Sequence, residues 1–428
     1  MTIKNDDMEL LRLVTVGSVD DGKSTLIGRL LVDTKGAFED QLMAVRKNND
    51  NVNEGDVVEG KDIDLARLTD GLQAEREQGI TIDVAYRYFS TPKRKFIMAD
   101  CPGHEQYTRN MVTGASTASA AIILVDARKG VLTQSRRHTH IIGLLGLSHL
   151  IVAVNKMDLV DYAEEVFERI KAELSDFCAQ QNIHDLICIP ISALEGDMVV
   201  ERGDKMPWYK GHTVLETLES LEVSDQIDTR SFRFPVQYVN RPQSDELHDF
   251  RGYAGRVVSG TVKTGDEVQV LPSGHTTRIK EIVTFDGNLA EAFAPQSVTL
   301  TLEDEIDISR GNMIVHSDQL PTTADEFAAT ICWMGDEPLS LRKKYFIKQT
   351  TNTVRAVVTE ICYRTDTNTL EHLTDIDQLS MNEIGKIKLK LLSPLTYDSY
   401  ADNHATGSFI IIDAFTNNTV AAGMIAKS

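Results

Sequence analysis

The stretch Gly17-Ser18-Val19-Asp20-Asp21-Gly22-Lys23-Ser24 decides the fold of this chain. It fits the phosphate-binding pattern G-x-x-x-x-G-K-[ST], in which the glycines let the backbone wrap around a phosphate and the lysine adds a full positive charge. The apolar residues 11–16 predict a buried strand before it, and residues 25–31 predict a helix after it. This order places the helix N-terminus, with its partial positive charge, at the phosphate.

The loop offers specific groups to a bound nucleotide. Lys23 would neutralise phosphate charge, and the Ser24 hydroxyl is suited to hold a magnesium ion. A carboxylate in such a loop is costly unless it faces solvent or holds a cation, so Asp20 either points outward or binds a monovalent cation near the β and γ phosphates. The residues expected to bind nucleotide here are Gly17, Ser18, Val19, Asp20, Asp21, Gly22, Lys23, Ser24 and Thr25.

Composition excludes several classes of protein. The chain has 428 residues, enough for two to four domains, and 42% hydrophobic residues, as expected of a globular protein. It has no run of about 18 uninterrupted apolar residues, and its polar start is neither a secretory signal nor a transit peptide. We therefore expect a cytoplasmic protein that binds no membrane. The formal net charge of −20 argues against a protein whose whole surface binds nucleic acid, although a local basic face is compatible with it. It favours a partner protein or a small polyanion bound at one site.

The five cysteines are odd in number, widely spaced, and include no C-x-x-C pair. This usage favours reduced, mostly buried thiols over a disulfide framework or a zinc site. The cysteines are Cys101, Cys178, Cys188, Cys332 and Cys362.

Short apolar runs alternate with helical patterns from residue 11 to about residue 221, which is typical of an α/β domain with a mostly parallel sheet and helices on both faces. A polar loop follows each run, and open α/β sheets bind ligands at the carboxyl ends of their strands. The runs are 11–16, 96–99, 121–125, 150–154 and 186–191.

Residues 36–78 form a long, acid-rich stretch without sustained apolar periodicity. The stretch is either a disordered insertion or a mobile loop that a ligand orders. Its end and continuation, residues 74–82, favour the second interpretation, because Thr81 lies just before a strand-like segment, 82–89. The Thr81 hydroxyl and carbonyl could then meet a magnesium ion and a γ-phosphate.

A second motif, Asp100-Cys101-Pro102-Gly103-His104, directly follows an apolar run and is also expected to bind nucleotide. Asp100 can accept from a magnesium-bound water, and the amide of Gly103 can approach a γ-phosphate. A lone histidine is usually structural, but His104 lies where an attacking water must be oriented, so we expect it to act in catalysis. Residues 105–112 after it predict a helix.

A third motif, Asn155-Lys156-Met157-Asp158, fits the N-K-x-D pattern that selects guanine. Asp158 would accept from the N1 proton and the 2-amino group of the base, which adenine cannot supply. Asn155 would brace neighbouring loops, and the aliphatic stem of Lys156 would cover the ring. The backbone of Ser192-Ala193-Leu194 is expected to contact the guanine O6 atom and to close the base pocket.

These motifs have the order and spacing of a P-loop GTPase domain. Mg²⁺ and Lys23 would neutralise the leaving diphosphate, while Thr81 and Gly103 would register the γ-phosphate. His104 would then position water for in-line attack. The expected metal ligands are Ser24, Thr81 and Asp100.

From about residue 230 the pattern changes to short alternating strands broken by turn residues. It predicts two β-barrel domains of roughly 90 to 110 residues each. The expected domains are 1–228, 229–319 and 320–428. The expected strands include 233–239, 255–262 and 267–271, followed by 326–333, 354–363, 384–392 and 407–413.

A GTPase domain followed by two β-barrels resembles the translation-factor GTPases, of the elongation factor Tu and 1-alpha kind. The Gly-Ile-Thr triplet, the loop 100–104 and the stretch 255–266 are shared with that superfamily. Within it, residues 17–24, 72–87 and 104–116 resemble the GTPase subunit of bacterial ATP sulfurylase, and the likeness covers nearly the whole chain.

The resemblance implies a heteromeric enzyme that makes adenosine 5'-phosphosulfate and pyrophosphate from ATP and sulfate. A smaller partner subunit of the ATP pyrophosphatase type would transfer the adenylyl group, while this chain would hydrolyse GTP to drive the reaction uphill. Some relatives carry a C-terminal kinase domain for adenylyl sulfate. No second phosphate loop follows Ser24, so we expect this chain to lack that activity.

The alternatives come from different classes of protein. A translation elongation factor that delivers aminoacyl-tRNA usually has His where this chain has Ser18, and often His or Ser in place of Asp21. Binding of tRNA also needs phosphate-neutralising Lys and Arg, which an acidic chain supplies poorly. The motifs alone do not exclude a third class, a GTP-dependent assembly or regulatory module without a coupled reaction of its own.

Overall fold

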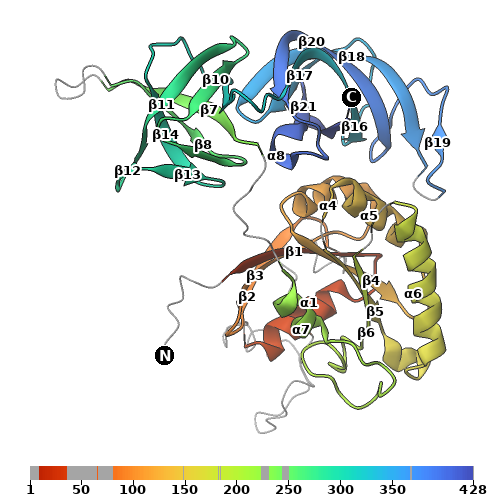
Figure 1. Ribbon diagram of the computed structural model, residues 1–428. Coiled ribbons are helices and arrows are strands. Elements are labelled where there is room, and N and C mark those ends of the chain that lie inside the picture. Colours follow the sequence, from red (N-terminus) through yellow and green to blue (C-terminus); the bar gives the residue numbers. More distant parts are fainter. Residues whose placement is uncertain are drawn as a thin grey trace. The chain divides into compact units, whose positions relative to one another are not determined.

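The computed structural model describes residues 9–35, 65, 81–147, 149–181, 183, 185–222, 231–242, 250–366 and 369–427. The chain divides into two compact units, Met1–Val223 and Ser224–Ser428, and each is described by itself (Figure 1). The stretch 36–78, interpreted above as a mobile loop, lies outside the described residues except for Leu65.

The first unit alternates strands with helices, as the sequence predicts. Its elements are β1 (Leu10–Gly17), α1 (Lys23–Asp33), β2 (Ala85–Ser90), β3 (Lys95–Asp100), η2 (Glu105–Tyr107), α4 (Thr108–Ala115), β4 (Ala120–Asp126), α5 (Thr133–Leu144), β5 (His149–Asn155), η3 (Met157–Val160), α6 (Glu164–Ala179), β6 (Leu186–Pro190) and α7 (Val214–Ser220).

The strands of this unit form one six-stranded sheet in the order β2-β3-β1-β4-β5-β6. All neighbours are parallel except β2, which runs antiparallel to β3 at one edge. Every residue of β4 is buried, because helices cover both faces of the sheet. In Figure 1, α4, α5 and α6 lie on one side of the sheet, and α1 and α7 lie on the other. The α/β fold class is therefore confirmed.

The second unit is built almost entirely from strands. Its elements are β7 (Arg233–Asn240), β8 (Gly252–Arg256), β9 (Thr261–Lys263), β10 (Glu267–Leu271), β11 (His275–Thr284), β12 (Gly287–Leu289), β13 (Glu291–Phe293), β14 (Ser297–Leu302), β15 (Met313–His316), β16 (Thr322–Trp333), β17 (Lys344–Gln349), β18 (Asn352–Thr365), β19 (His372–Leu373), β20 (Ile384–Tyr397), α8 (His404–Gly407), β21 (Ser408–Asp413) and β22 (Thr419–Ile425).

Two seven-stranded sheets in this unit each close into a barrel. The first has the order β10-β15-β7-β8-β14-β11-β12 and closes through β10 and β11. The second has the order β17-β21-β22-β16-β20-β18-β19 and closes through β17 and β18. This confirms the expected architecture of an α/β domain followed by two β-barrels. The boundaries 1–228, 229–319 and 320–428 remain a proposal.

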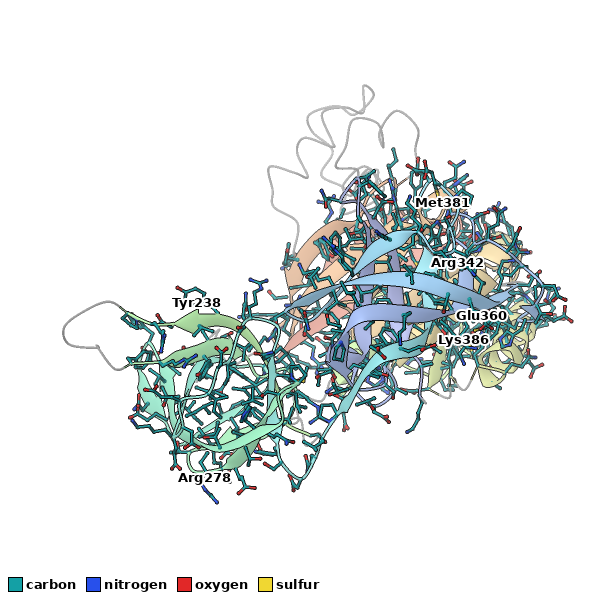
Figure 2. All side chains as sticks on the ribbon, turned by 90° about the horizontal axis from the view of Figure 1, so that it is seen from above. Tyr238, Arg278, Arg342, Glu360, Met381 and Lys386 are labelled. Atoms are coloured by element: carbon teal, nitrogen blue, oxygen red, sulfur yellow. The ribbon has the colours of Figure 1, made fainter. Side chains whose placement is uncertain are left out.

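Each barrel encloses its own apolar core, with polar side chains outside. The first core includes Phe234 and Tyr253, and the second includes Trp333 and Tyr345. Figure 2 shows all side chains, and its labels mark residues such as Tyr238 on the first barrel and Glu360 on the second. Among the described helices, none is both long and apolar enough to cross a membrane.

One expected strand is wrong. Residues 255–262 do not form a single strand, because β8 ends at Arg256 and β9 begins at Thr261. Gly260 lies between them with a positive φ of 70°, and Ser259 bridges to Arg233 instead of continuing the ladder. A left-handed glycine interrupts regular strand geometry, which an alternating apolar pattern does not reveal.

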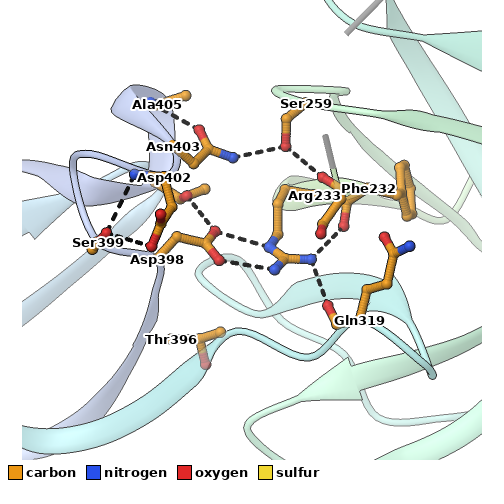
Figure 3. A network of polar contacts seen from close by, with 12 residues as sticks. Phe232, Arg233, Ser259, Gln319, Thr396, Asp398, Ser399, Asp402, Asn403 and Ala405 are labelled. Atoms are coloured by element: carbon orange, nitrogen blue, oxygen red, sulfur yellow. Dashed lines mark hydrogen bonds and ion pairs between the residues drawn. The ribbon is translucent and has the colours of Figure 1, made fainter. Parts of the chain in front are cut away.

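A buried polar network joins the two barrels (Figure 3). The guanidinium of Arg233 in β7 donates to both carboxylate oxygens of Asp398, which follows β20, at 2.9 and 2.8 Å. The Asp398 carboxylate also accepts from Thr406 at 2.6 Å, and Asn403 donates to Ser259 at 2.8 Å. Only 4% of the Arg233 side chain and 14% of the Asp398 side chain are exposed, so the pair is shielded from water.

Candidate functional site

The phosphate-binding loop connects the end of β1 to the start of α1, as its motif requires. Gly22 caps the helix in the left-handed region with a φ of 92°. A Cβ added to Gly22 would lie 2.4 Å from the Asn155 side-chain nitrogen, so a larger residue is excluded. The tight turn leaves the amides at the start of α1 facing the space where phosphates bind in this motif.

Lys23 lies in the centre of this loop and is 7% exposed. Its ammonium donates to the backbone carbonyls of Gly17 at 3.0 Å and Ser18 at 2.9 Å. Burial lowers the pKa of Lys23, whereas the nearby Asp100 and Asp21 carboxylates oppose that shift. A buried cation whose hydrogen bonds go to backbone carbonyl oxygens is suited to attract phosphate oxygens.

Gly103 presses against the same lysine from the loop after β3. A Cβ added to Gly103 would lie 2.5 Å from the Gly17 carbonyl oxygen and 2.6 Å from the Lys23 ammonium. The structure thus brings together Lys23 and Gly103, which sequence reasoning placed at the γ-phosphate. Glycine is needed here because the two backbones approach closely.

The two acids of the loop have different surroundings. Asp20 is exposed and has a positive φ of 68°. Asp21 is 1% exposed, and its carboxylate accepts from the Ser18 amide at 2.7 Å. Burial raises the pKa of Asp21 against the hydrogen bond from Ser18. The other Asp21 oxygen and the Ser18 hydroxyl are buried without a hydrogen-bond partner in the described part of the chain.

The residues predicted to bind the base lie together at the carboxyl ends of β5 and β6. Asn155 donates to the Asp21 carbonyl at 2.8 Å and accepts from the Ala193 amide at 2.9 Å. The Ser192 hydroxyl donates to the Asp158 carboxylate at 2.6 Å, which fixes that carboxylate in place. The phosphate loop, the N-K-x-D loop and the loop after β6 therefore form one connected site.

Sequence reasoning missed Asp126, the last residue of β4. Its carboxylate lies 3.0 Å from the Lys156 ammonium and accepts from the Arg128 guanidinium at 3.0 and 2.7 Å. Burial alone would raise the pKa of Asp126, but hydrogen bonds from Arg128 and Lys156 outweigh it and lower that pKa well below its usual range. The Lys156 ammonium also donates to the Asp20 carbonyl.

The sequence does carry a signal for Asp126, because it is an acid at the end of a strand that is otherwise wholly apolar. Lys156 itself has a positive φ of 64°, a conformation that costs a non-glycine residue about 1 kcal/mol or more. The contacts to Asp126 and Asp20 hold the strained lysine where its stem can cover a base.

Asp100 and His104 lie at and just after the carboxyl end of β3, while Thr81 precedes β2, whose first residue Ala85 pairs with Asp100. Asp100 ends β3 and is 1% exposed. His104 is partly exposed, and its Nδ1 atom accepts from the Gln106 amide at 3.3 Å. Thr81 is partly exposed. Cys101, between Asp100 and Gly103, is a buried thiol whose pKa is raised by burial and by the Asp100 charge.

The donor set fits a magnesium ion that is shared with phosphates. No group of three or more His, Cys, Asp or Glu residues suited to a metal occurs in the described ranges. Mg²⁺ commonly binds through one or two carboxylates and substrate phosphates instead of an all-protein cage. A buried carboxylate at Asp100 and a hydroxyl at Ser24 beside the phosphate loop match that requirement.

Family comparisons cover three segments of the chain. Residues 8–230 match the family described as "Elongation factor Tu GTP binding domain". Residues 253–315 match "Elongation factor Tu domain 2", and residues 326–426 match "GTP-eEF1A C-terminal domain-like".

Individual relatives match the chain over nearly its full length. It is 55% identical to sulfate adenylyltransferase subunit 1 of Bacteroides fragilis, over 99% of this chain and 87% of that protein. It is also 55% identical to sulfate adenylyltransferase subunit 1 of Alteromonas mediterranea, over 99% of this chain and 88% of that protein. A solved structure of sup35 complexed with GDP aligns over 98% of this chain and 94% of that one, at 20% identity and a TM-score of 0.44.

Proposed function

Because this chain belongs to the sulfate adenylyltransferase subunit 1 family, we propose that it is the GTP-hydrolysing subunit of a sulfate adenylyltransferase. It couples the hydrolysis of GTP to the synthesis of adenosine 5'-phosphosulfate and pyrophosphate from ATP and sulfate. The observation that carries this proposal is 55% identity over 99% of the chain, together with a connected guanine nucleotide site.

Guanine is selected by hydrogen bonding. Asp158, held by Ser192, accepts from the N1 proton and the 2-amino group of the base. Adenine offers neither group there, so it would leave a carboxylate unpaired. The fixed position of Asn155 between the phosphate loop and Ala193 supports this role for the whole motif.

The chain's own residues would promote hydrolysis by charge and position. Lys23 stabilises the negative charge that develops between the β and γ phosphates, and the Gly103 amide approaches the γ-phosphate. Because His104 Nδ1 accepts from the Gln106 amide, its Nε2–H donates to the attacking water and orients that water in line with the bond that breaks. Thr81 and Gly103 would contact the γ-phosphate and would lose that contact after hydrolysis.

Ser24, Thr81 and Asp100 are the residues that would hold Mg²⁺. When bound, the ion supplies positive charge to the β and γ phosphates. A monovalent cation near Asp20 is a weaker proposal, because that side chain is exposed while Asp21 carries the buried carboxylate.

A second subunit completes the enzyme. The name of the relatives, subunit 1, implies a partner, and we propose a smaller adenylyltransferase of the ATP pyrophosphatase type. The anhydride between phosphate and sulfate is unstable to hydrolysis, so its synthesis needs an energy source such as GTP. We propose that the enzyme acts in the cytoplasm, where cysteines stay reduced, and the five cysteines of this chain are free. We propose no nucleic acid or membrane as a partner.

The alternative, a translation factor that delivers aminoacyl-tRNA, has less support. It shares the domain architecture, but the relatives that match 99% of the chain are sulfate adenylyltransferase subunits.

The test is GTP hydrolysis by the full chain, alone and with the smaller subunit, ATP and sulfate. We expect turnover to rise only when all three are present, with adenosine 5'-phosphosulfate accumulating in parallel. The variant Lys23→Ala should abolish both signals. Stimulation by ribosomes and aminoacyl-tRNA instead would support the alternative.

A further inference from the structure

Arg29 connects the phosphate helix to the base loop. It lies in α1, and only 12% of its side chain is exposed. Its Nε atom donates to the Ala193 carbonyl at 3.2 Å, and its terminal nitrogen donates to the Leu194 carbonyl. These contacts join residues 164 and 165 positions apart in the sequence, between two parts of the nucleotide site.

The contacts fix the orientation of two peptide groups, 193–194 and 194–195, because the Ala193 and Leu194 carbonyls belong to one each. In a trans peptide the carbonyl and the following N–H point in opposite directions, so anchoring the Ala193 carbonyl on Arg29 directs the Leu194 amide away from α1. The neighbouring Ala193 amide already donates to Asn155 at 2.9 Å. The Glu195 amide of the second peptide donates to the Ser192 hydroxyl at 3.2 Å. Of the two amides that Arg29 orients, the Leu194 amide is therefore the one directed toward the base.

The loop needs such an anchor because it lies at the surface. The Leu194 side chain is 62% exposed. Gly196 lies beside the guanidinium and has a positive φ of 92°. A Cβ added there would lie 3.8 Å from Arg29, an ordinary contact distance, so the loop leaves room for the guanidinium. Asp33 lies 3.7 Å from the guanidinium on the same helix and balances its charge.

We propose that Arg29 is a positioning residue for guanine recognition, which holds the 193–194 peptide so that its amide donates to the O6 atom of the base. The inference rests on the proposed use of GTP by this chain. Arginine suits this place because its planar fork donates to two carbonyls at once, whereas lysine is a point charge. Since α1 starts at Lys23, Arg29 also ties the base loop to the helix that binds the phosphates.

The experiment uses the full chain, alone and with its partner subunit, and compares the variants Arg29→Ala, Arg29→Lys and Asp33→Asn. Release of a ribose-labelled fluorescent GDP is followed by stopped flow. Affinity is then measured for GTP and for 6-thioguanosine 5'-triphosphate. The thio analogue keeps the N1 proton and the 2-amino group but replaces O6 by sulfur, a weak acceptor.

We expect Arg29→Ala to release GDP about tenfold faster, the effect of losing roughly one charge-assisted hydrogen bond. The preference for GTP over the thio analogue should shrink, because the aligned donor is lost. The value of KM for GTP should rise while kcat at saturating GTP stays within about twofold. Arg29→Lys should recover part of the preference, and Asp33→Asn, which keeps both carbonyl contacts, should resemble the wild type.

Two results would overturn the inference. The first is wild-type release and wild-type preference in both Arg29 variants. The second is an equal loss of affinity for GTP and for the thio analogue, which would mean a general structural role. A wild-type chain that binds no labelled GDP would overturn the proposed function itself, so the two failures are distinct.

Discussion

The side-chain amide of Asn110 in α4 donates to the Ile82 carbonyl at 2.8 Å, one residue beyond Thr81. This hydrogen bond ties the helix after His104 to the segment that precedes β2. The same helix packs at Gly114, where an added Cβ would lie 2.5 Å from the Cys101 sulfur and 3.3 Å from Val84. The two segments proposed to respond to the γ-phosphate are therefore joined directly.

Asn110→Ala should slow GTP hydrolysis about fivefold to tenfold, because a lost hydrogen bond of about 1 kcal/mol loosens Thr81 relative to His104. Affinity for GDP should change little, since GDP has no γ-phosphate. Single-turnover hydrolysis and GDP binding measure the two effects. Thr113→Ala is the matched control, because that exposed hydroxyl donates to the Arg109 carbonyl of the same helix. Equal hydrolysis by the two variants would contradict the coupling.

Gly103→Ala should reduce hydrolysis by about a hundredfold, the typical effect of losing a preorganised charge contact. The added methyl would lie within 2.6 Å of both the Gly17 carbonyl oxygen and the Lys23 ammonium, so the lysine must move. Steady-state GTPase assays at saturating GTP test this. The control is Gly143→Ala in α5, where an added Cβ would meet the Cδ1 atom at the flexible end of the Ile183 side chain, at 2.9 Å. Wild-type activity in Gly103→Ala would show that the loop can shift to admit the methyl group without displacing Lys23.

Asp126→Asn should weaken GTP binding by roughly tenfold to a hundredfold, because it removes the charge that holds Lys156, whose stem is proposed to cover the base. Isothermal titration calorimetry with GTP measures this, and kcat should fall much less than affinity. Asp402→Asn, a loss of an exposed ion pair in the second unit, serves as the control. Unchanged affinity would mean that the Asp20 carbonyl alone positions Lys156.

His138 in α5 should make the first unit sensitive to acid. It is 2% exposed, and burial, with the charges of Lys23 and Arg137, lowers its pKa from 6.5 to about 3. The unfolded chain therefore binds a proton that the folded chain does not between these values. The free energy of unfolding should fall by about 1.4 kcal/mol for each pH unit below 6.5, and this loss should stop near pH 3.

The measurement is urea unfolding at pH 7 and pH 5, followed by hydrogen exchange in peptides from α5. The variant His138→Gln does not titrate, so its loss of stability between these pH values should be smaller than that of the wild type. Parallel pH profiles of the two proteins would argue against a neutral buried His138.

Asp398→Ala should destabilise the joined barrels by about 3 to 5 kcal/mol, because it leaves the buried Arg233 cation without its partner. Replacing both residues should cost less than replacing Asp398 alone, and a double-mutant cycle on denaturant unfolding measures the coupling. The exposed pair of Lys388 and Glu360 gives a matched control whose loss should matter little. Additive effects of Arg233 and Asp398 would refute the network.

Much of the fold could be predicted because apolar runs in the sequence mark the strands and the motif residues stand at the strand ends. The predicted strand at 150–154 became β5, His149–Asn155, since a buried parallel strand reads as a continuous apolar run. The motif residues Asp100 and Asn155 end strands, so their gathering at one edge of the sheet follows from topology. The roles assigned to these site residues stay predictions until they are measured.

The rest depends on contacts that no local pattern encodes. Arg29 lies outside every motif, and its partners are more than 160 residues away. Which of the adjacent acids Asp20 and Asp21 is buried depends on the course of the loop backbone, in which Asp20 has a φ of 68° and Asp21 is 1% exposed. The break between β8 and β9 likewise follows from one glycine conformation. Such features require the backbone in three dimensions.

The hydrogen bond from Ser192 to Asp158 bears on which purine nucleotide limits sulfate activation in the cell. In the proposed role of Asp158, a carboxylate held as an acceptor would keep ATP, the far commoner purine nucleotide and the proposed substrate of the partner subunit, out of this chain. Sulfate activation would then depend on two separately regulated purine pools. A cell that starves for guanine nucleotides should stop activating sulfate while its ATP is still abundant, so guanine supply would govern the entry of sulfur into metabolism.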